Sequence, residues 1–272
     1  MDQSTTLNPG ASPAPRTRLA ISPEQFVPDH LFLHIQAGSL RVYDGHQTLT
    51  LQAGDCYLVR KNRLVRYDQS EPEVACQLTF FCFEEKFLRS FQARHHLAAK
   101  KTKPTATFLS LTQAELIPAF IQSLTPYRDE TGKLTNVFAE VKYEELLLIL
   151  LQQQPTLADI LFDYELPGKI RLEEFMNRHF RFNVSLTRFA FLTGRSLSAF
   201  KRDFQAIFNQ TPSRWLLQRR LQEAYFLLDK QHQKPSMVYL ELGFKDLSHF
   251  SFAFKTQFGL APSALGKQPK KS

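Results

Sequence analysis

Two sets of side chains near the C-terminus have the types and spacing of residues that contact DNA bases. The first set is Ser198, Lys201, Arg202 and Gln205, and the second is Ser248, His249 and Phe252. Intervals of three and four residues place the members of each set on one face of a helix. Arg and Lys donate well to guanine O6 and N7, and Phe packs on a thymine methyl group. The pattern therefore predicts base readout, with the first set better equipped for hydrogen bonding.

The segments that carry these two sets form an internal repeat with an offset of fifty residues. Phenylalanine recurs every fourth residue in both copies, at positions 200, 204 and 208 and again at 250, 254 and 258. An apolar stripe at helical spacing is typical of a buried face, so the predicted readers occupy the opposite face. Each copy reads as a short helix, a glycine turn and a second helix, over 186–208 and 237–258. This outline predicts two helix-turn-helix units.

A connecting helix is predicted from Pro212 to about Asp229, after a supporting helix over 169–179. Thr211 stands at the N-cap position and Pro212 at the first helical position, where a missing N–H costs nothing. At 1.5 Å per residue, this helix is roughly 25 Å long. Such a rod can hold two recognition helices about one DNA turn apart. One chain could then read a bipartite site.

The excess of positive charge in the C-terminal region favours a polyanion as its binding partner. Residues 167–272 hold 18 Lys/Arg against 7 Asp/Glu, whereas residues 1–166 hold 16 against 19. A basic module with two helix-turn-helix units is typical of a DNA-binding domain. Phosphate contacts set affinity and its salt dependence rather than base preference. The residues expected at phosphates are Ser196, Arg214, Arg219, Arg220, Asp246 and Lys255.

The N-terminal half shows a different pattern. Short alternating apolar runs with turn signals, such as Asp44-Gly45, predict at least six strands between Phe26 and Phe83. A small antiparallel sandwich or barrel is the expected fold. Helices are predicted over 113–124 and 136–153. The second carries more apolar residues than one amphipathic stripe needs, so it either packs on the barrel or forms a dimer seam.

The sequence gives little support for a membrane protein, a secreted protein, a metal site or an enzyme. No apolar run approaches the roughly 20 residues of a membrane span, and residues 1–18 lack a signal-peptide core. Cys56, Cys76 and Cys82 lack metal-type spacing and indicate reduced thiols in a cytoplasmic protein. A metal-dependent enzyme would need a His and carboxylate cluster. The nearby histidines are His30, His34 and His46, without a carboxylate at a suitable offset. We therefore expect neither catalysis, a cofactor nor a metal.

The region from about 169 to 265 resembles the DNA-binding domain of the AraC/XylS family of bacterial transcription regulators. The segment from Leu240 to Phe250, LELGFKDLSHF, is similar to the family signature around the second helix-turn-helix unit. The match continues through Trp215, the Arg219-Arg220-Leu221 run and the Pro262-Ser263 pair. Phe252 departs from the arginine that is frequent there, which puts a contact from the second helix in doubt.

The resemblance implies binding to promoter DNA, activation through RNA polymerase, and control by a cupin-like N-terminal domain. Many relatives have dimerising helices after that domain, so a homodimer is implied as well. The effector could be a small molecule, for example an apolar one held by aromatic side chains inside the barrel, or a protein. The aromatic candidates are Phe32, Tyr43, Tyr57, Phe80 and Phe81.

The expected fold class is α+β, with a cupin-like β-barrel, a helical linker or dimerisation region, and an all-α double helix-turn-helix domain. The expected boundaries are a disordered tail over 1–22, the barrel over 23–100, the linker over 101–166 and the DNA-binding domain over 167–266. A sequence-specific transcription regulator, most simply an activator, is the leading hypothesis. Two alternatives are an architectural nucleic-acid binder and a metal-dependent cupin enzyme fused to a DNA-binding module.

Overall fold

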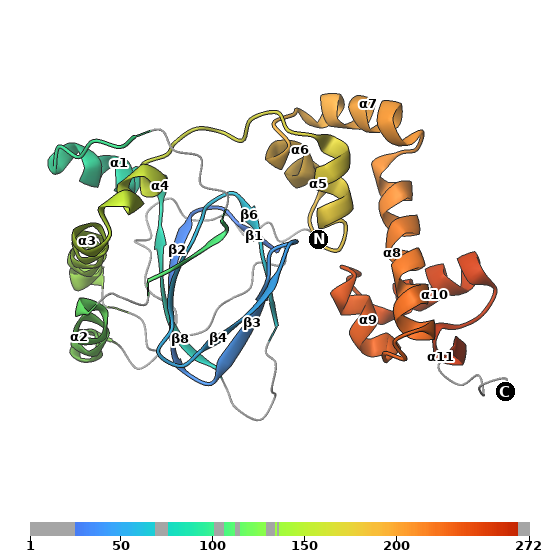
Figure 1. Cartoon of the computed structure of the whole chain (residues 1–272), viewed down its shortest axis with the longest axis horizontal. Helices are drawn as coiled ribbons and strands as arrows, with labels where there is room; N and C mark the ends of the chain where they lie inside the picture. Colours follow the sequence, from blue (N-terminus) through green and yellow to red (C-terminus); the bar gives the residue numbers. More distant parts are fainter. Residues whose placement is uncertain are drawn as a thin grey trace, which may run out of the picture.

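A computed structural model describes residues 25–68, 76–100, 106–111, 115–128, 134 and 136–265. The expected tail over residues 1–22 lies outside these ranges. The described chain is a mixed α/β protein, with β-sheets and flanking helices in the N-terminal part and helices alone in the C-terminal part (Figure 1). No described helix combines the length and apolar character needed to cross a bilayer.

The N-terminal strands form three antiparallel sheets, in the orders β1-β6, β8-β2-β5-β9 and β4-β3-β7. Their bounds are β1 Phe26–Val27, β2 His30–Ala37, β3 Ser39–Tyr43, β4 Thr48–Gln52, β5 Cys56–Val59, β6 Arg63–Leu64, β7 Arg66–Asp68, β8 Gln77–Phe83 and β9 Phe108–Ser110. The antiparallel strands agree with the sequence prediction. The hydrogen-bonded ladders remain three separate sheets, so they do not form one closed barrel.

Helices cover one face of the largest sheet. The described N-terminal helices are α1 Glu85–Arg94, α2 Leu116–Ser123, η1 Thr125–Tyr127, α3 Asn136–Gln153, η2 Pro155–Leu157 and α4 Ala158–Leu161. The bounds of α3 match the prediction. One side of α3 buries Tyr143, Leu146 and Leu150 in a core that also contains Phe81 of β8. Val141 on its other side is 61% exposed, so α3 has both a buried and an exposed apolar face.

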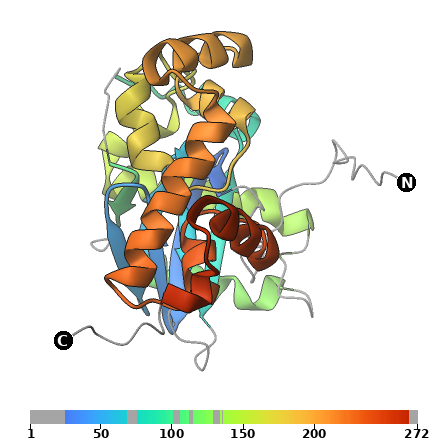
Figure 2. The ribbon, with the colours of Figure 1, turned by 90° about the vertical axis from the view of Figure 1, so that its right-hand side faces the viewer.

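The C-terminal part contains seven described helices, and their order is the predicted double helix-turn-helix. Their bounds are α5 Leu172–His179, α6 Leu186–Leu192, α7 Leu197–Phe208, α8 Pro212–Asp229, α9 Pro235–Glu241, α10 Leu247–Phe258 and α11 Pro262–Leu265. Helices α6 and α7 form the first unit, and α9 and α10 form the second. The connecting helix α8 runs between the two units (Figures 1 and 2).

The two parts share apolar contacts. Phe26 of β1 and Leu64 of β6 are buried in the same core as the C-terminal helices. The Phe26 ring meets Phe191 of α6 edge-on at a centroid distance of 6.5 Å. Tyr43, at the end of β3, stacks on Phe182 at 5.5 Å. The N-terminal sheets therefore pack directly against the helix-turn-helix domain.

Candidate DNA-binding surface

Helix α7 presents the first set of predicted readers. The helix begins after Ser196, whose Oγ accepts a hydrogen bond from the Ala199 N–H at 3.2 Å. This N-cap satisfies one of the backbone donors that a helix start leaves free. Phe200 and Phe204 are completely buried, and Phe204 and Phe208 pack against Trp215 of α8. The phenylalanine stripe thus fixes α7 on the domain core and turns the opposite face outward.

That outward face carries all four predicted readers of the first unit. Ser198, Lys201, Arg202 and Gln205 are all exposed. The Arg202 side chain is 79% exposed, and its Nη2 lies 3.3 Å from Oδ1 of Asp203. An exposed ion pair of this kind contributes little stability, so the guanidinium can exchange it for a base or phosphate at small cost.

Helix α10 is built in the same way. The Asp246 carboxylate caps its start by accepting the His249 N–H at 2.6 Å, and Gly259 ends it in a left-handed conformation with φ 77°. Asn209 ends α7 in the equivalent conformation, with φ 53°. Phe250 and Phe254 are completely buried. The repeat in sequence therefore corresponds to a repeat in helix capping and burial.

The predicted readers of the second unit also lie on the exposed side of their helix. Ser248, His249 and Phe252 are exposed, and so is Lys255 further along α10. Phe252 is 73% exposed, which is unusual for a large apolar ring in this domain. A ring in that position can meet a thymine methyl but cannot donate a hydrogen bond to guanine. The chemistry available on α10 is thus less polar than that on α7.

The two turn glycines are held against neighbouring backbone. Gly194 has φ 66°, and a Cβ there would lie 2.4 Å from the Gly168 carbonyl carbon. Gly243 has φ 76°, and a Cβ there would lie 2.5 Å from the Arg181 carbonyl oxygen. Both the backbone conformation and the lack of space favour glycine. Each turn is therefore fixed by a different part of the chain, one by the linker and one by the segment before α6.

The six predicted phosphate contacts occupy different environments. Arg214 and Lys255 are exposed, as a phosphate contact requires. Arg219 donates to Glu223 at 3.3 Å, and its guanidinium lies 4.6 Å from the centre of the Phe180 ring. The Ser196 and Asp246 side chains cap α7 and α10, and a carboxylate such as Asp246 repels phosphate at close range. The sequence predicted the Asp246 cap of the helix that begins at Leu247, whereas the capping role of Ser196 was not predicted.

Arg220 requires a correction. Its guanidinium donates to the carbonyl oxygens of Phe180, Phe182 and Gly243 at 2.7, 2.7 and 2.9 Å. Burial lowers its pKa to about 10. These bonds connect the turn of the second unit to the segment before α6. We therefore assign Arg220 to the interior support of the domain and remove it from the set of phosphate contacts.

The sequence prediction also omitted a basic residue beside the second recognition helix. Lys245 is exposed directly before the Asp246 cap, at the start of α10. Helix N-termini favour anions, and a lysine there adds to that effect. Its position beside a predicted N-cap was the available signal. We add Lys245 to the candidate phosphate contacts.

The three histidines considered as metal ligands lie in different environments. His30 is buried, its Nδ1 accepts the Lys61 N–H at 3.4 Å, and burial lowers its pKa to about 3. His34 is half-buried and His46 is exposed. In the part of the chain that the structure describes, no three His, Cys, Asp or Glu side chains form a group that could hold a metal ion.

The aromatic candidates for an effector site inside the sheets are distributed over several environments. Phe32, Phe80 and Phe81 are buried in the protein core. Tyr57 is half-buried and contacts Phe108 edge-on at 6.5 Å, while Tyr43 contacts Phe182 of the C-terminal part. These side chains belong to three different apolar clusters, so they contribute to the core and to the contact between the two parts.

Comparison with known proteins agrees with the geometry. The chain matches the family model of the ExsA N-terminal regulatory domain over residues 30–160 and that of a helix-turn-helix domain over 189–268. The virulence regulon transcriptional activator VirF of Yersinia enterocolitica is 27% identical over 241 residues, covering 86% of this chain and 88% of VirF. The HTH-type transcriptional regulator ExsA of Pseudomonas aeruginosa is 24% identical over 229 residues, covering 83% and 82%.

Among solved structures, ToxT from Vibrio cholerae aligns with a TM-score of 0.39 at 15% identity, covering 89% of this chain and 90% of ToxT. The sheets, the two helix-turn-helix units and the matched regulatory domain together define a two-domain DNA-binding transcription regulator, not an enzyme. The chain belongs to the AraC/XylS family, and its C-terminal domain is the AraC-type helix-turn-helix domain.

Proposed function

We propose that this protein activates transcription by placing α7 and α10 in successive major grooves of a bipartite promoter site. The observation that carries the proposal is the exposure of all seven predicted base readers on helices whose opposite faces are buried. Helix α8 has 18 residues, and at 1.5 Å per residue it separates the two units by roughly one turn of DNA. A single chain would then contact both halves of the site.

The two halves of this site are read by different chemistry. Lys201 and Arg202 of α7 favour guanine through hydrogen bonds, whereas Phe252 of α10 favours a thymine methyl. Arg214, Lys245 and Lys255 supply phosphate contacts that carry no sequence information. The sequence preference of the protein therefore depends more on the half-site under α7.

We propose a regulatory domain over 23–100, a helical linker or dimerisation region over 101–166 and a DNA-binding domain over 167–266. In this proposal the N-terminal sheets form a cupin-like domain that regulates DNA binding. The protein acts in the cytoplasm and contacts RNA polymerase at the promoter. VirF, which is named a transcriptional activator, and ExsA, which is named a transcriptional regulator, align with this chain over most of their length. This similarity supports activation as the direction of control.

Helix α3 supports a homodimer. Phe138, Val141 and Leu148 leave an exposed apolar stripe on the side of α3 that faces away from the sheet core. A second copy of the chain would cover this stripe. We expect Val141→Asp to shift the protein toward monomer in sedimentation experiments. Glu140→Gln, at an exposed neighbouring position, should leave the equilibrium unchanged.

Selection of bound DNA from a random pool tests the proposal with the full chain. The expected result is a consensus of two unequal half-sites whose centres lie about 10–10.5 base pairs apart. Arg202→Ala should weaken binding to that consensus by about 1–3 kcal/mol and relax one base position. Arg214→Ala should weaken consensus and random DNA alike. Recovery of no preferred sequence would favour an architectural DNA binder instead.

A further inference from the structure

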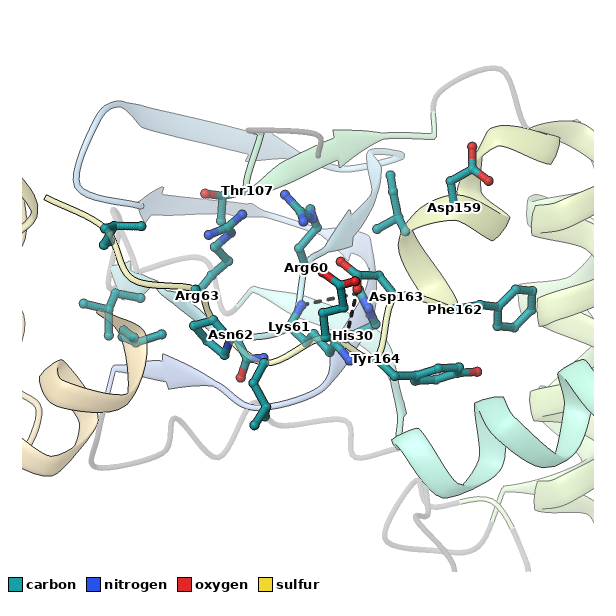
Figure 3. Close-up of a pocket in the computed structure, with 18 of the residues that line it drawn as sticks. His30, Arg60, Lys61, Asn62, Arg63, Thr107, Asp159, Phe162, Asp163 and Tyr164 are labelled. Atoms are coloured by element: carbon teal, nitrogen blue, oxygen red, sulfur yellow. Dashed lines mark hydrogen bonds between the residues drawn. The ribbon is translucent and has the colours of Figure 1, made fainter. Parts of the chain in front are cut away.

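A large cleft lies between the N-terminal sheets and the segment that leads into the DNA-binding domain. Its volume is about 1390 Å³. One wall is the loop and strand from Arg60 to Leu64, and the other includes residues 159–170 (Figure 3). Phe175 and His179 of α5 also line it. The cleft thus adjoins both parts of the molecule and is separate from the exposed faces of α7 and α10.

Two arginines on the N-terminal wall direct their charges toward the same part of this cleft. The side chains of Arg60 and Arg63 lie side by side near Thr107 (Figure 3). Burial lowers the pKa of both, that of Arg60 to about 10, and the Arg63 charge lowers the pKa of Arg60 further. Two like charges that are partly removed from water repel each other. A bound anion would offset this unfavourable arrangement.

Arg60 donates through Nη1 to the Ala106 carbonyl at 3.5 Å, and Lys61 and Arg89 share Glu85 as an ion-pair partner. Lys61 lies 3.6 Å from Glu85 and 5.3 Å from the centre of the Tyr164 ring. Arg89 pairs with the same glutamate at 2.7 Å and lies over the same ring at 3.8 Å. Their charges are therefore largely compensated within the protein, unlike that of Arg63.

Arg63 has no ion-pair partner among the described residues. Its Nε is buried and has no hydrogen-bond partner, and among the described residues no carboxylate oxygen lies within 4.0 Å of its guanidinium. Asp44 acts on Arg63 and Asp163 on Arg60 as neighbouring charges that raise the pKa. These carboxylates moderate the positive potential without closing the cleft.

We propose that Arg60 and Arg63 bind a small organic anion through its phosphate or carboxylate group, and that this ligand regulates DNA binding. The regulatory step rests on the proposed function, whereas anion binding stands alone. A guanidinium presents paired N–H donors that match either group in a bidentate contact. The cleft volume of about 1390 Å³ exceeds the roughly 300–1,000 Å³ of typical small-molecule sites, so a small organic anion has room in it.

The position of the site explains how occupancy would reach the DNA-binding domain. Arg63 directly precedes Leu64, which is buried in the core of the C-terminal helices. On the other wall, the linker reaches Gly168, whose carbonyl group lies against the Gly194 turn of the first unit. A ligand between these walls would constrain Leu64 and the linker together. Both lead to the first helix-turn-helix unit.

Thermal unfolding of the full chain tests anion binding directly. Inorganic phosphate and citrate are added separately at low millimolar concentration, against sodium chloride at matched ionic strength. Binding to the folded state raises the unfolding midpoint. A rise with phosphate alone identifies a phosphoryl ligand, and a rise with citrate alone identifies a carboxylate ligand. If neither anion raises the midpoint above chloride, the proposal is wrong.

Variants separate the cleft from the basic DNA-binding surface. Arg63→Gln and Arg60→Gln should each weaken the anion's apparent affinity by about tenfold or more, the loss expected for a charge-assisted bidentate contact. Arg41→Gln, on the exposed side of β3, and Arg202→Ala should retain the full shift. Circular dichroism checks that each variant is folded. An equal anion shift in wild type and in both cleft variants would overturn the assignment.

The anion-binding test and the DNA-selection test can fail separately. Anion binding without a preferred DNA sequence would defeat the proposed function and leave the cleft site intact. A preferred DNA sequence without an anion shift would defeat the cleft site alone. With both present, the regulatory step requires that the active anion change promoter affinity in wild type but not in Arg63→Gln.

Discussion

Replacing Arg220 by alanine should destabilise the DNA-binding domain severely. The guanidinium donates three hydrogen bonds of 2.7–2.9 Å to carbonyl oxygens from two separate segments. A hydrogen bond from a charged group contributes about 1.5–3 kcal/mol, and such contributions are not additive when they share one side chain. Removal of the side chain leaves these carbonyl oxygens without their donor, and a buried acceptor that stays unpaired costs about 1–3 kcal/mol. We expect a loss in this range for Arg220→Ala.

Fluorescence of Trp215 provides the assay. It is the only tryptophan of the chain and packs on Phe204 and Phe208. Its signal in a urea titration therefore follows the DNA-binding domain rather than the sheets. Arg214→Ala is the matched control, because this exposed arginine on the same helix should change stability by less than about 0.5 kcal/mol.

Two results would contradict this reasoning about Arg220. A stability loss no larger than that of Arg214→Ala would show that the three hydrogen bonds contribute little. A large loss of DNA affinity at unchanged stability would return Arg220 to the phosphate contacts that the sequence suggested. Arg220→Lys should be intermediate, because one ammonium cannot reproduce the planar fork that reaches three carbonyls.

Three further predictions concern helix caps, turns and pH. Asp246→Ala removes the cap on the His249 N–H and should cost about 1 kcal/mol in urea unfolding, while Asp246→Asn should retain most of it. Gly243→Ala forces a Cβ toward the Arg181 carbonyl at φ 76° and should cost more than about 1 kcal/mol, the lower range for a strained backbone. A melting temperature equal to wild type would refute the close contact. Burial lowers the pKa of His179 from the usual histidine value of 6.5 to about 4, so on acidification the unfolded chain takes up a proton before the folded chain does. Stability should fall as the pH decreases from about 6.5 to about 4, and His179→Phe should flatten that part of the profile.

The helices of the DNA-binding domain were predictable because their signals are local. Phenylalanines at four-residue spacing and a glycine in each turn indicate α7 and α10. The first unit begins and ends at the predicted residues 186 and 208, the second ends at the predicted residue 258, and α8 has its predicted bounds. Strands β1, β6 and β9 were missed, since two or three residues are too few to show alternation. A closed barrel was also expected, but sheet closure depends on pairing between distant strands.

The role of Arg220 could not be predicted from the sequence. Arg219 and Arg220 are adjacent and identical in type, and both suggested phosphate contacts. On a helix, neighbouring residues point about 100° apart. Arg219 pairs with Glu223 on the outside of α8, whereas Arg220 meets the carbonyls near Phe180 and Gly243. Only the path of those other segments distinguishes the two side chains.

The contacts between the two parts of the molecule limit how the N-terminal domain can control DNA binding. Phe26 packs on Phe191 of α6, and Arg188 of α6 lies 3.8 Å from the Phe26 ring centre. Arg66 donates to the Glu241 carbonyl at the end of α9. Both helices are the supporting members of their units, and the readers on α7 and α10 stay exposed in the whole chain. Control by covering the readers therefore does not fit this arrangement. Because each unit is contacted through its supporting helix, a change in the sheets would act by altering the orientation of one recognition helix relative to the other.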